Sequence, residues 1–398
     1  MAVSKFLGSI LLIIGTSIGG GMLALPIATS GGGFYYSTIA FVFCWLMMTA
    51  GALLILEVLQ PLPLGSNMVT LAKHYLGRPG EILIWLFYLA LLYSLLGAYI
   101  SGGTDVLKSL LADFRVHVPT HIVSCLYTLS FSLIIFSGIK SVDYVNRGLM
   151  FGKLGVYFLL ILIISPFVKL QTFSNGHFLK LLPSLSILIT SFGFGSIVPS
   201  LRDYWQNDIP QLKRIILWGS LTPLICYLLW NFVIMGAVSQ TGPWGLNTLL
   251  HSDHATSGLG KGLAETTKSA AIFSMFNFFS CICMLTAFLN VSLGLFDFLA
   301  DGLKLKKTGY QGYSVLFFTF IPPLAIVLVN PGIYIQALNY AGIFCIILLL
   351  MFPILMGFRA RLTHQTDTLH LLPGKYSFLS TLFIMGLLCM MIPYMINL

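Results

Sequence analysis

Residues Gly15–Pro26 read Gly-Thr-Ser-Ile-Gly-Gly-Gly-Met-Leu-Ala-Leu-Pro and lie within the first long apolar run of the chain. The stretch holds four glycines, two hydroxyl side chains and a proline. Glycine and proline weaken a helix, and in lipid each unpaired backbone N–H or C=O group costs several kcal/mol. The stretch therefore predicts an interrupted membrane helix whose free main-chain groups bind something polar.

A second stretch repeats this pattern later in the chain. Thr16–Gly21 and Thr190–Gly195 both have the form T-S-x-G-x-G, and each is followed within five residues by a proline, Pro26 or Pro199. The first lies in the first apolar run, over 6–28, and the second in the sixth, over 183–204. If each run crosses the membrane once, five crossings separate the two starting points, so the two stretches enter the membrane from opposite sides. Paired interrupted spans in two inverted halves are typical of a transporter binding site. Chance similarity between two glycine-rich helices is the alternative.

The composition predicts a polytopic membrane protein. Charged residues make up 8% of the 398, hydrophobic residues 57%, and the mean hydropathy is +0.93. Soluble domains carry about a quarter charged residues. Apolar runs of about 20 residues, long enough to cross a bilayer, recur at 6–28, 34–57, 81–103, 120–139, 148–168, 183–204, 215–238, 269–299, 314–330, 333–356 and 376–397. We expect an all-α integral membrane fold with eleven transmembrane helices and a single domain over residues 1–398.

The net charge of +9 reflects membrane orientation rather than a nucleic-acid partner. With the N-terminus inside, fourteen of the 21 Lys and Arg residues fall in cytoplasmic segments and six in outer loops. This asymmetry follows the positive-inside rule. We therefore expect a cytoplasmic N-terminus and an outward, periplasmic C-terminus, with the lipid bilayer as a partner and no nucleic acid.

Two loops carry structure of their own. Residues 61–80 mix apolar and basic positions at helical spacing, which predicts a short helix along the cytoplasmic interface. Residues 239–268 form the longest outer loop, and we expect them to cap an outward-facing cavity.

The predicted interruptions offer chemistry that suits an α-amino acid. Free carbonyls near Gly15–Ile18 and Ser191–Gly193 would bind an ammonium group, and the positive end of the half-helix after Gly21 would bind a carboxylate. The alternative for these glycines is close helix packing. The predicted head-group residues are Gly15, Thr16, Ser17, Gly19, Gly20, Gly21, Ser191 and Gly193.

Aromatic side chains would line the rest of the predicted pocket. Phe192 and Phe194 flank the second interruption, and Tyr93 lies near the middle of predicted span 3. Aromatic walls stack well on aromatic substrates. Because 14% of all residues are aromatic, a packing or lipid-facing role is the alternative for each of the three.

Three ionisable residues lie inside predicted spans: Glu57, Lys153 and Asp297. The two acids are near cytoplasmic ends, where water or a salt bridge would satisfy them. Lys153 lies six residues past Arg147, about 9 Å deeper along the helix. A lysine shielded from water can exchange protons during transport. Alternatively, its ammonium permanently binds carbonyls of the interrupted helix.

The chain contains neither a P-loop pattern nor an H-E-x-x-H pattern. All seven cysteines fall in predicted spans, where we expect no disulfide and no metal site. We therefore expect neither an enzyme nor a bound cofactor, and only the proton motive force as an energy source.

The chain resembles the bacterial aromatic amino acid permeases, most closely the tyrosine-specific proton symporters. The matching stretches are "GTSIGGGMLALP", "LEV" at 56–58, "TLAKHYLG" at 70–77, "AYISGG" at 98–103, "TSFGFGSIVPS" at 190–200, "LGLFDFLAD" at 293–301, "PPLA" at 322–325 and "YAG" at 340–342. They follow in order along nearly the whole chain.

This resemblance implies a five-plus-five inverted-repeat fold, with repeats over about 6–168 and 183–330 and further helices over 333–397. It also implies a bacterial inner-membrane importer of aromatic amino acids driven by protons. In related carriers a lysine of span 5 replaces a sodium ion beside spans 1 and 8, which places Lys153 in that role with Thr286 as neighbour. Tyrosine carriers often have a histidine after S-F-G-F, but here Gly195 follows.

The sequence thus predicts a secondary transporter that imports an aromatic amino acid, with tyrosine favoured, together with a proton. A tryptophan or phenylalanine carrier of the same fold, an amino acid exchanger and a sodium-coupled carrier remain as alternatives.

Overall fold

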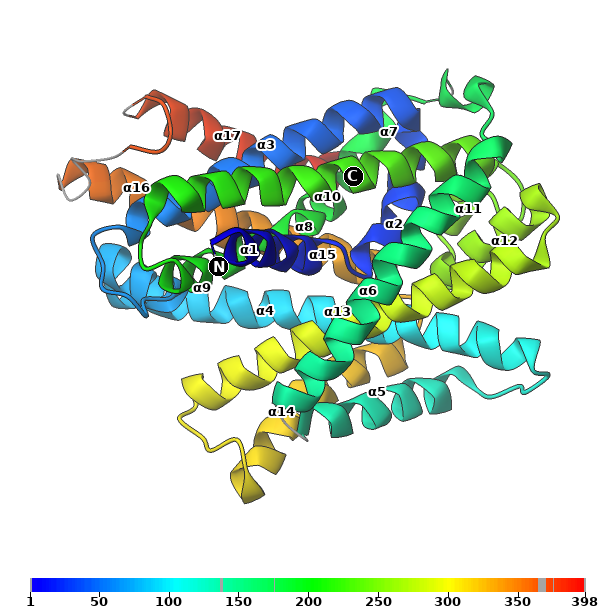
Figure 1. The fold of residues 1–398 in the computed structure, drawn as a ribbon, viewed down its shortest axis with the longest axis horizontal. Coiled ribbons are helices and arrows are strands. Elements are labelled where there is room, and N and C mark those ends of the chain that lie inside the picture. Colours follow the sequence, from blue (N-terminus) through cyan, green and yellow to red (C-terminus); the bar gives the residue numbers. More distant parts are fainter. Residues whose placement is uncertain (1, 137–138, 175, 364–369, 375, 397–398) are drawn as a thin grey trace.

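The computed structural model describes residues 2–136, 139–174, 176–363, 370–374 and 376–396. Across these residues the regular structure is helical, without strands (Figure 1). The helices are α1 (Ala2–Ser17), α2 (Gly21–Ala28), α3 (Gly33–Leu59), α4 (Met68–Asp113), α5 (Thr120–Phe136), α6 (Ile139–Ile164), α7 (Phe178–Leu181), α8 (Leu185–Ser191), α9 (Val198–Tyr204), α10 (Ile209–Ala237), α11 (Leu246–Leu249), α12 (Ala255–Thr267), α13 (Ala270–Gly302), α14 (Gly309–Val329), α15 (Tyr334–Ile346), α16 (Phe352–Leu362) and α17 (Ser377–Ile396).

The helices are long and apolar enough to make this a multi-pass membrane protein, as the composition predicts. In the described part of the chain, eight segments meet the length and hydropathy needed to span a bilayer: Gly21–Leu59, Met68–Ala112, Gly148–Phe167, Phe178–Tyr204, Ile209–Ala237, Ala270–Gly302, Gly309–Val329 and Tyr334–Leu362. Shorter apolar helices cover Lys5–Ser17, Thr120–Phe136 and Ser377–Ile392. The count of eleven spans stays a prediction.

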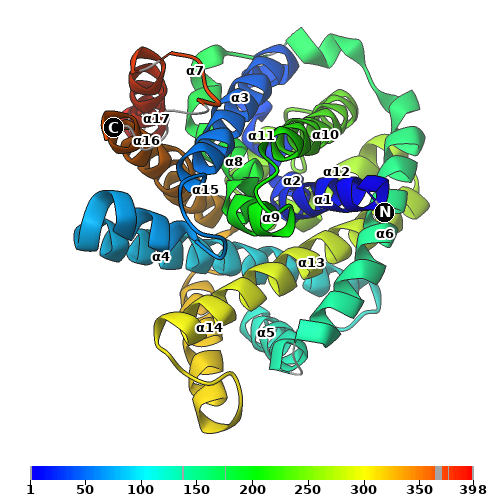
Figure 2. The same ribbon diagram turned by 60° about the vertical axis from the view of Figure 1, so that its left-hand side comes forward.

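The two short helices α2 and α8 lie in the interior. Every residue of α2 is buried, and α2 packs against α8 and α10. α1 lies against α10, and α5 lies beside α14 at one end of the molecule (Figures 1 and 2). The two glycine-rich stretches are therefore brought together at the centre of the helical packing.

Helix α4 combines the predicted interfacial helix with the predicted third span. It begins with a capping box, in which the Asn67 side chain accepts from the N–H of Thr70 and the Thr70 hydroxyl accepts from the N–H of Asn67. A kink follows at Gly77, where φ is 72°. Only glycine adopts this conformation readily. The predicted short helix over 61–80 thus begins at Met68 and bends into the span.

The segment over 239–268 folds into α11 and α12. Asp105 of α4 holds the start of α12, because its carboxylate accepts from the Ser257 N–H and the Ser257 hydroxyl, each at 2.8 Å. His254 Nδ1 lies 3.0 Å from Asp105 Oδ1, and this hydrogen bond raises the pKa of His254. A carboxylate from another helix therefore caps α12 in place of its own N-cap side chain.

Candidate functional site

The first glycine-rich stretch interrupts a helix, as predicted. α1 ends at Ser17 and α2 begins at Gly21. Close approach explains the glycines. A Cβ atom on Gly20 would lie 2.9 Å from Met284 Sδ and from the Tyr99 ring, and one on Gly19 would lie 3.3 Å from Ala287 Cβ. Side chains of α4 and α13 therefore pack directly on the bare backbone.

The second stretch is interrupted as well. α8 ends at Ser191, a 3₁₀ turn covers Gly193–Ile197, and α9 begins at Val198. A Cβ atom on Gly193 would lie 3.3 Å from Cys345 Sγ of α15. A Cβ atom on Gly21 would lie 3.8 Å from the Ser191 hydroxyl, so the two interruptions face each other.

Three side chains from three different helices donate hydrogen bonds to carbonyls of the first interruption. Lys153 Nζ of α6 donates to Ile18 O at 2.5 Å, and the Tyr334 hydroxyl of α15 donates to Gly20 O at 2.7 Å. The Tyr227 hydroxyl of α10 lies 2.6 Å from Ser17 O. The donors to Ser17 O and Ile18 O satisfy carbonyls at the end of α1, as a membrane interior requires, whereas Gly20 O also accepts from the Leu23 N–H at 3.2 Å.

Tyr227 also connects the two interruptions. Its hydroxyl lies 3.0 Å from Ser191 O, the carbonyl at the end of α8. A phenol has one hydrogen to donate, so two carbonyls share it and together keep lone pairs for a further donor. The arrangement can therefore accept a cationic ammonium group between α1 and α8.

Lys153 and its predicted neighbour Thr286 donate hydrogen bonds to carbonyls in different segments of the chain. Lys153 is 2% exposed, and its ammonium binds the interrupted helix α1. The Thr286 hydroxyl bonds within α13, to the carbonyls of Ile282 and Cys283 at 2.9 and 3.1 Å. The structure thus joins Lys153 to the glycine-rich stretch and keeps the Thr286 hydroxyl in its own helix.

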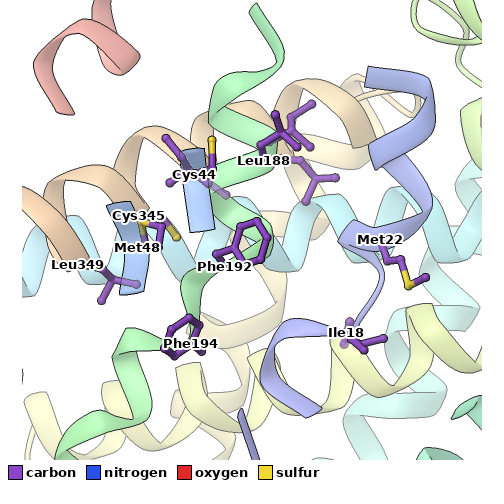
Figure 3. Close-up of a cluster of buried hydrophobic side chains, with 14 of the residues drawn as sticks. Ile18, Met22, Cys44, Met48, Leu188, Phe192, Phe194, Cys345 and Leu349 are labelled. Atoms are coloured by element: carbon purple, nitrogen blue, oxygen red, sulfur yellow. The ribbon is translucent and has the colours of Figure 1, made fainter. Parts of the chain in front are cut away.

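The predicted aromatic residues lie in two places. Phe192 and Phe194 are fully buried beside the interruptions, within a cluster that includes Cys44, Met48, Cys345 and Leu349 (Figure 3). Phe192 meets the Tyr227 ring edge to face, with 5.3 Å between ring centroids. Tyr93 instead donates to Phe318 O of α14 at 2.6 Å.

Some of the remaining predicted head-group residues lie at the interruptions, and others lie away from them. Ser17 and Ser191 supply the carbonyls that Tyr227 joins. Gly15 lies in the last turn of α1, where a Cβ atom would meet Met150. Thr16 is exposed, and its hydroxyl bonds to Ile13 O in the same helix. Thr16 therefore points away from the interruption.

Sequence reasoning missed Tyr99, Tyr227, Met284 and Tyr334. Each contacts the first interruption from a distant part of the chain. No local sequence motif distinguishes these residues. The three tyrosines cannot be told apart by sequence from the others among the seventeen in the chain. Hydrogen bonds to carbonyls of the interruption identify Tyr227 and Tyr334, and close packing on Gly20 identifies Tyr99 and Met284.

The two intramembrane acids are paired, as expected. Glu57 and Arg361 are both buried, with Arg361 Nε 2.8 Å from Glu57 Oε1 and Nη2 2.7 Å from the same oxygen. The N–H groups of Leu371 and Leu372 also donate to Glu57. Asp297 binds Lys307 at 2.7 Å. These acids act structurally, at the ends of helices.

A cavity of about 1360 Å³ opens beside α2 and α8. The loop over 239–268 contributes seven lining residues, including Gln240, Asn247 and Asp253. Ala28 of α2 and Ile187 of α8 line it too. The cavity therefore reaches both half-helices that end or begin at the interruptions.

Comparison with known proteins gives a consistent result. The model of the tryptophan/tyrosine permease family matches residues 2–393. "Tyrosine-specific transport system 2" of Haemophilus influenzae is 32% identical, with 100% of this chain and 98% of that protein aligned. "Tryptophan-specific transport protein" of Pseudomonas aeruginosa is 30% identical over 90% and 87%. "Glutamine transporter 2" of Aliivibrio fischeri is 27% identical over 92% of each.

Proposed function

Because the chain belongs to the tryptophan/tyrosine permease family, we propose that it is a secondary transporter that imports an aromatic amino acid, with tyrosine favoured, together with a proton. One observation carries the proposal: a single hydroxyl, that of Tyr227, reaches the carbonyls at both helix interruptions. The name of the 32% identical relative favours tyrosine. The names of other relatives keep tryptophan as the alternative.

The head group of the amino acid binds between the interruptions. The ammonium group donates hydrogen bonds to Ser17 O and Ser191 O, and the carboxylate lies at the start of α2 near Gly21. Phe192 and Phe194 lie beside this position and provide apolar contact for the ring. Met284 and Tyr99, which pack on Gly20, form the opposite wall.

The proposed architecture has eleven spans in a five-plus-five inverted repeat. The repeats cover about 6–168 and 183–330, and the last helices cover 333–397. The interruption between α1 and α2 and the one between α8 and α9 support it, since they occupy corresponding positions in the two repeats. We place the protein in the bacterial inner membrane, with the N-terminus cytoplasmic and the C-terminus periplasmic.

Uptake into proteoliposomes tests the substrate and the coupling ion. Labelled tyrosine, tryptophan, phenylalanine and glutamine are offered under an imposed pH gradient, with and without a protonophore. We expect tyrosine to accumulate above its outside concentration and the protonophore to abolish this accumulation. Accumulation that depends on a sodium gradient instead would favour a sodium-coupled carrier. Accumulation that depends on amino acid loaded inside the proteoliposomes would favour an exchanger.

Lys153→Ala should abolish gradient-driven accumulation of tyrosine, because Lys153 is the buried ionisable group bound to the interrupted helix. The measurement is the ratio of inside to outside tyrosine under a pH gradient. Lys169→Ala, which removes an exposed lysine, serves as the control and should accumulate tyrosine as the unmodified protein does. Full accumulation by Lys153→Ala would remove Lys153 from the coupling mechanism.

Tyr227→Phe should lower the melting temperature and make it more responsive to tyrosine. Removing the hydroxyl leaves Ser17 O and Ser191 O without their donor, at a cost of about 1–3 kcal/mol. A bound ammonium group replaces that donor. Thermal unfolding is measured with and without saturating tyrosine.

Tyr75→Phe is the matched control for this substitution. The Tyr75 hydroxyl also donates to a buried carbonyl, Val58 O at 3.0 Å, away from the interruptions. Both variants should lose stability, but only Tyr227→Phe should gain an enlarged shift with tyrosine. Equal tyrosine shifts in the two variants would place the ammonium elsewhere.

A further inference from the structure

Buried polar atoms without a partner gather where α10, α12 and α13 meet. Twelve buried side-chain atoms in the described residues lack a hydrogen-bond partner, and five of them belong to four residues at this junction. We call these four residues the polar cluster: Trp230, Thr256, Asn277 and Ser280. Each such atom costs about 1–3 kcal/mol if it stays unpaired. The cluster therefore needs a polar occupant.

The members of the polar cluster come from parts of α10, α12 and α13 that pack on one another, and they lie away from solvent. The Trp230 ring packs on Phe276 and Phe279 of α13, with centroid distances of 6.3 and 5.4 Å. Asn277 follows Phe276, and its Oδ1 lies 3.3 Å from where a Gly260 Cβ would be. Thr256 is one turn before Gly260 on α12. All four cluster residues are at most 1% exposed.

The chemistry of the polar cluster suits water. The Trp230 indole only donates, the Asn277 amide donates and accepts, and the hydroxyls of Thr256 and Ser280 do both. None of these side chains carries a charge, so an ion would find no compensation. Buried water makes about three hydrogen bonds to groups of this kind.

The polar cluster extends from Thr256 of α12 toward the site of Lys153. Asn277 and Ser280 share one face of α13 with Met284 and Ala287, which contact the first interruption. Gly152, beside Lys153, faces Ile282, about 7.5 Å along α13 from Asn277. Tyr157, one turn from Lys153 on α6, packs against Trp230 with 6.0 Å between ring centroids.

We propose that the polar cluster holds water molecules that pass protons between the outer side and Lys153. Each water accepts a proton on one side and releases one on the other, so O–H bonds exchange without net chemistry. This inference rests on the proposed proton coupling. Because the four residues are at most 1% exposed and the Trp230 ring packs on Phe276 and Phe279, we infer water as the occupant rather than the larger phenol of the substrate.

Radiolytic hydroxyl-radical labelling of the unmodified protein tests for the water directly. X-rays convert ordered water to hydroxyl radicals, which oxidise the side chains beside it. Trp230 and Phe276 should be oxidised, whereas Phe173, 4% exposed and packed against the rings of Phe34 and Phe232, should not. Equal protection of Trp230 and Phe173 would overturn the proposal, whatever ion drives transport.

Two variants test the proton route. Asn277→Leu and Ser280→Ala should reduce pH-driven tyrosine accumulation at least tenfold and leave tyrosine–tyrosine exchange at equal pH within twofold. Thr128→Val removes another buried hydroxyl without a partner, on α5, and should change neither rate. This control accounts for the general effect of deleting a buried polar group.

The remaining outcomes decide against the proton route. An equal loss of accumulation and exchange, or no loss of either, would overturn it. A changed preference between tyrosine and phenylalanine with intact coupling would assign the cluster to the substrate phenol instead. The unmodified protein is measured first with a protonophore, so a failure of proton coupling itself is recognised separately from a failure of the cluster.

Discussion

Gly20→Val is expected to reduce tyrosine uptake about 100-fold, equivalent to about 2.7 kcal/mol. A Cβ atom at this position lies 2.9 Å from Met284 Sδ and from two atoms of the Tyr99 ring. Met284 is flexible, but Tyr99 is a buried ring and cannot yield as easily. The interruption must therefore shift, which moves Gly20 O away from Tyr334 and disturbs the proposed head-group site.

Gly97→Val on α4 is the matched control for Gly20→Val. A Cβ atom on Gly97 meets no atom within 4 Å. Uptake by Gly97→Val should stay near that of the unmodified protein. The amount of each variant in the membrane is measured alongside, because overpacking also costs about 1–3 kcal/mol of stability. Near-normal uptake by Gly20→Val would mean that the close approach of Tyr99 and Met284 is not needed for transport.

Arg361→Leu should destabilise the protein by about 3–5 kcal/mol, because it leaves the Glu57 carboxylate buried without its cation. The pair fixes α16 to α3, and Arg361 Nη1 also donates to Gly374 O at 2.7 Å. The measurement is the thermal unfolding temperature of the purified protein. The double variant Glu57→Leu with Arg361→Leu should recover part of the loss, since no charge then stays buried.

Lys307→Leu provides the control for a partly exposed ion pair. Lys307 binds Asp297 at 2.7 Å, but its side chain is 40% exposed. Exposed pairs contribute at most about 1 kcal/mol. The unfolding temperature of Lys307→Leu should therefore change little. A similar change in Lys307→Leu and Arg361→Leu would show that burial does not set the strength of the Glu57 pair.

Several features of the fold were predictable because they depend on residues close in sequence. The glycines at 19–21 and the pattern over 190–195 marked where α1 and α8 end. The spacing over 61–80 predicted a helix but not its junction with the next span, where the non-helical backbone of Gly77 bends the chain directly from one helical part into the other. Lys153 was found because an ionisable residue is rare at such depth.

The side chains that satisfy the interruptions were not predictable. Tyr227 lies 210 residues from Ser17, and Tyr334 lies 314 residues from Gly20. Tyr93 and Tyr99 look alike in the sequence, yet Tyr93 binds α14 and Tyr99 packs on Gly20. Six residues on a helix turn a side chain by about 600°, which places the two tyrosines on different faces.

The amino-acid sequence alone determined that this chain is a helical membrane protein with two interrupted helices, because transfer of apolar residues into lipid and weakening of helices by glycine are local effects. The tertiary structure decided which groups meet the freed carbonyls: Lys153, Tyr227 and Tyr334. A hydrogen bond requires a donor within about 3 Å of its acceptor, and only the packing of α6, α10 and α15 around α1 and α2 brings those donors that close.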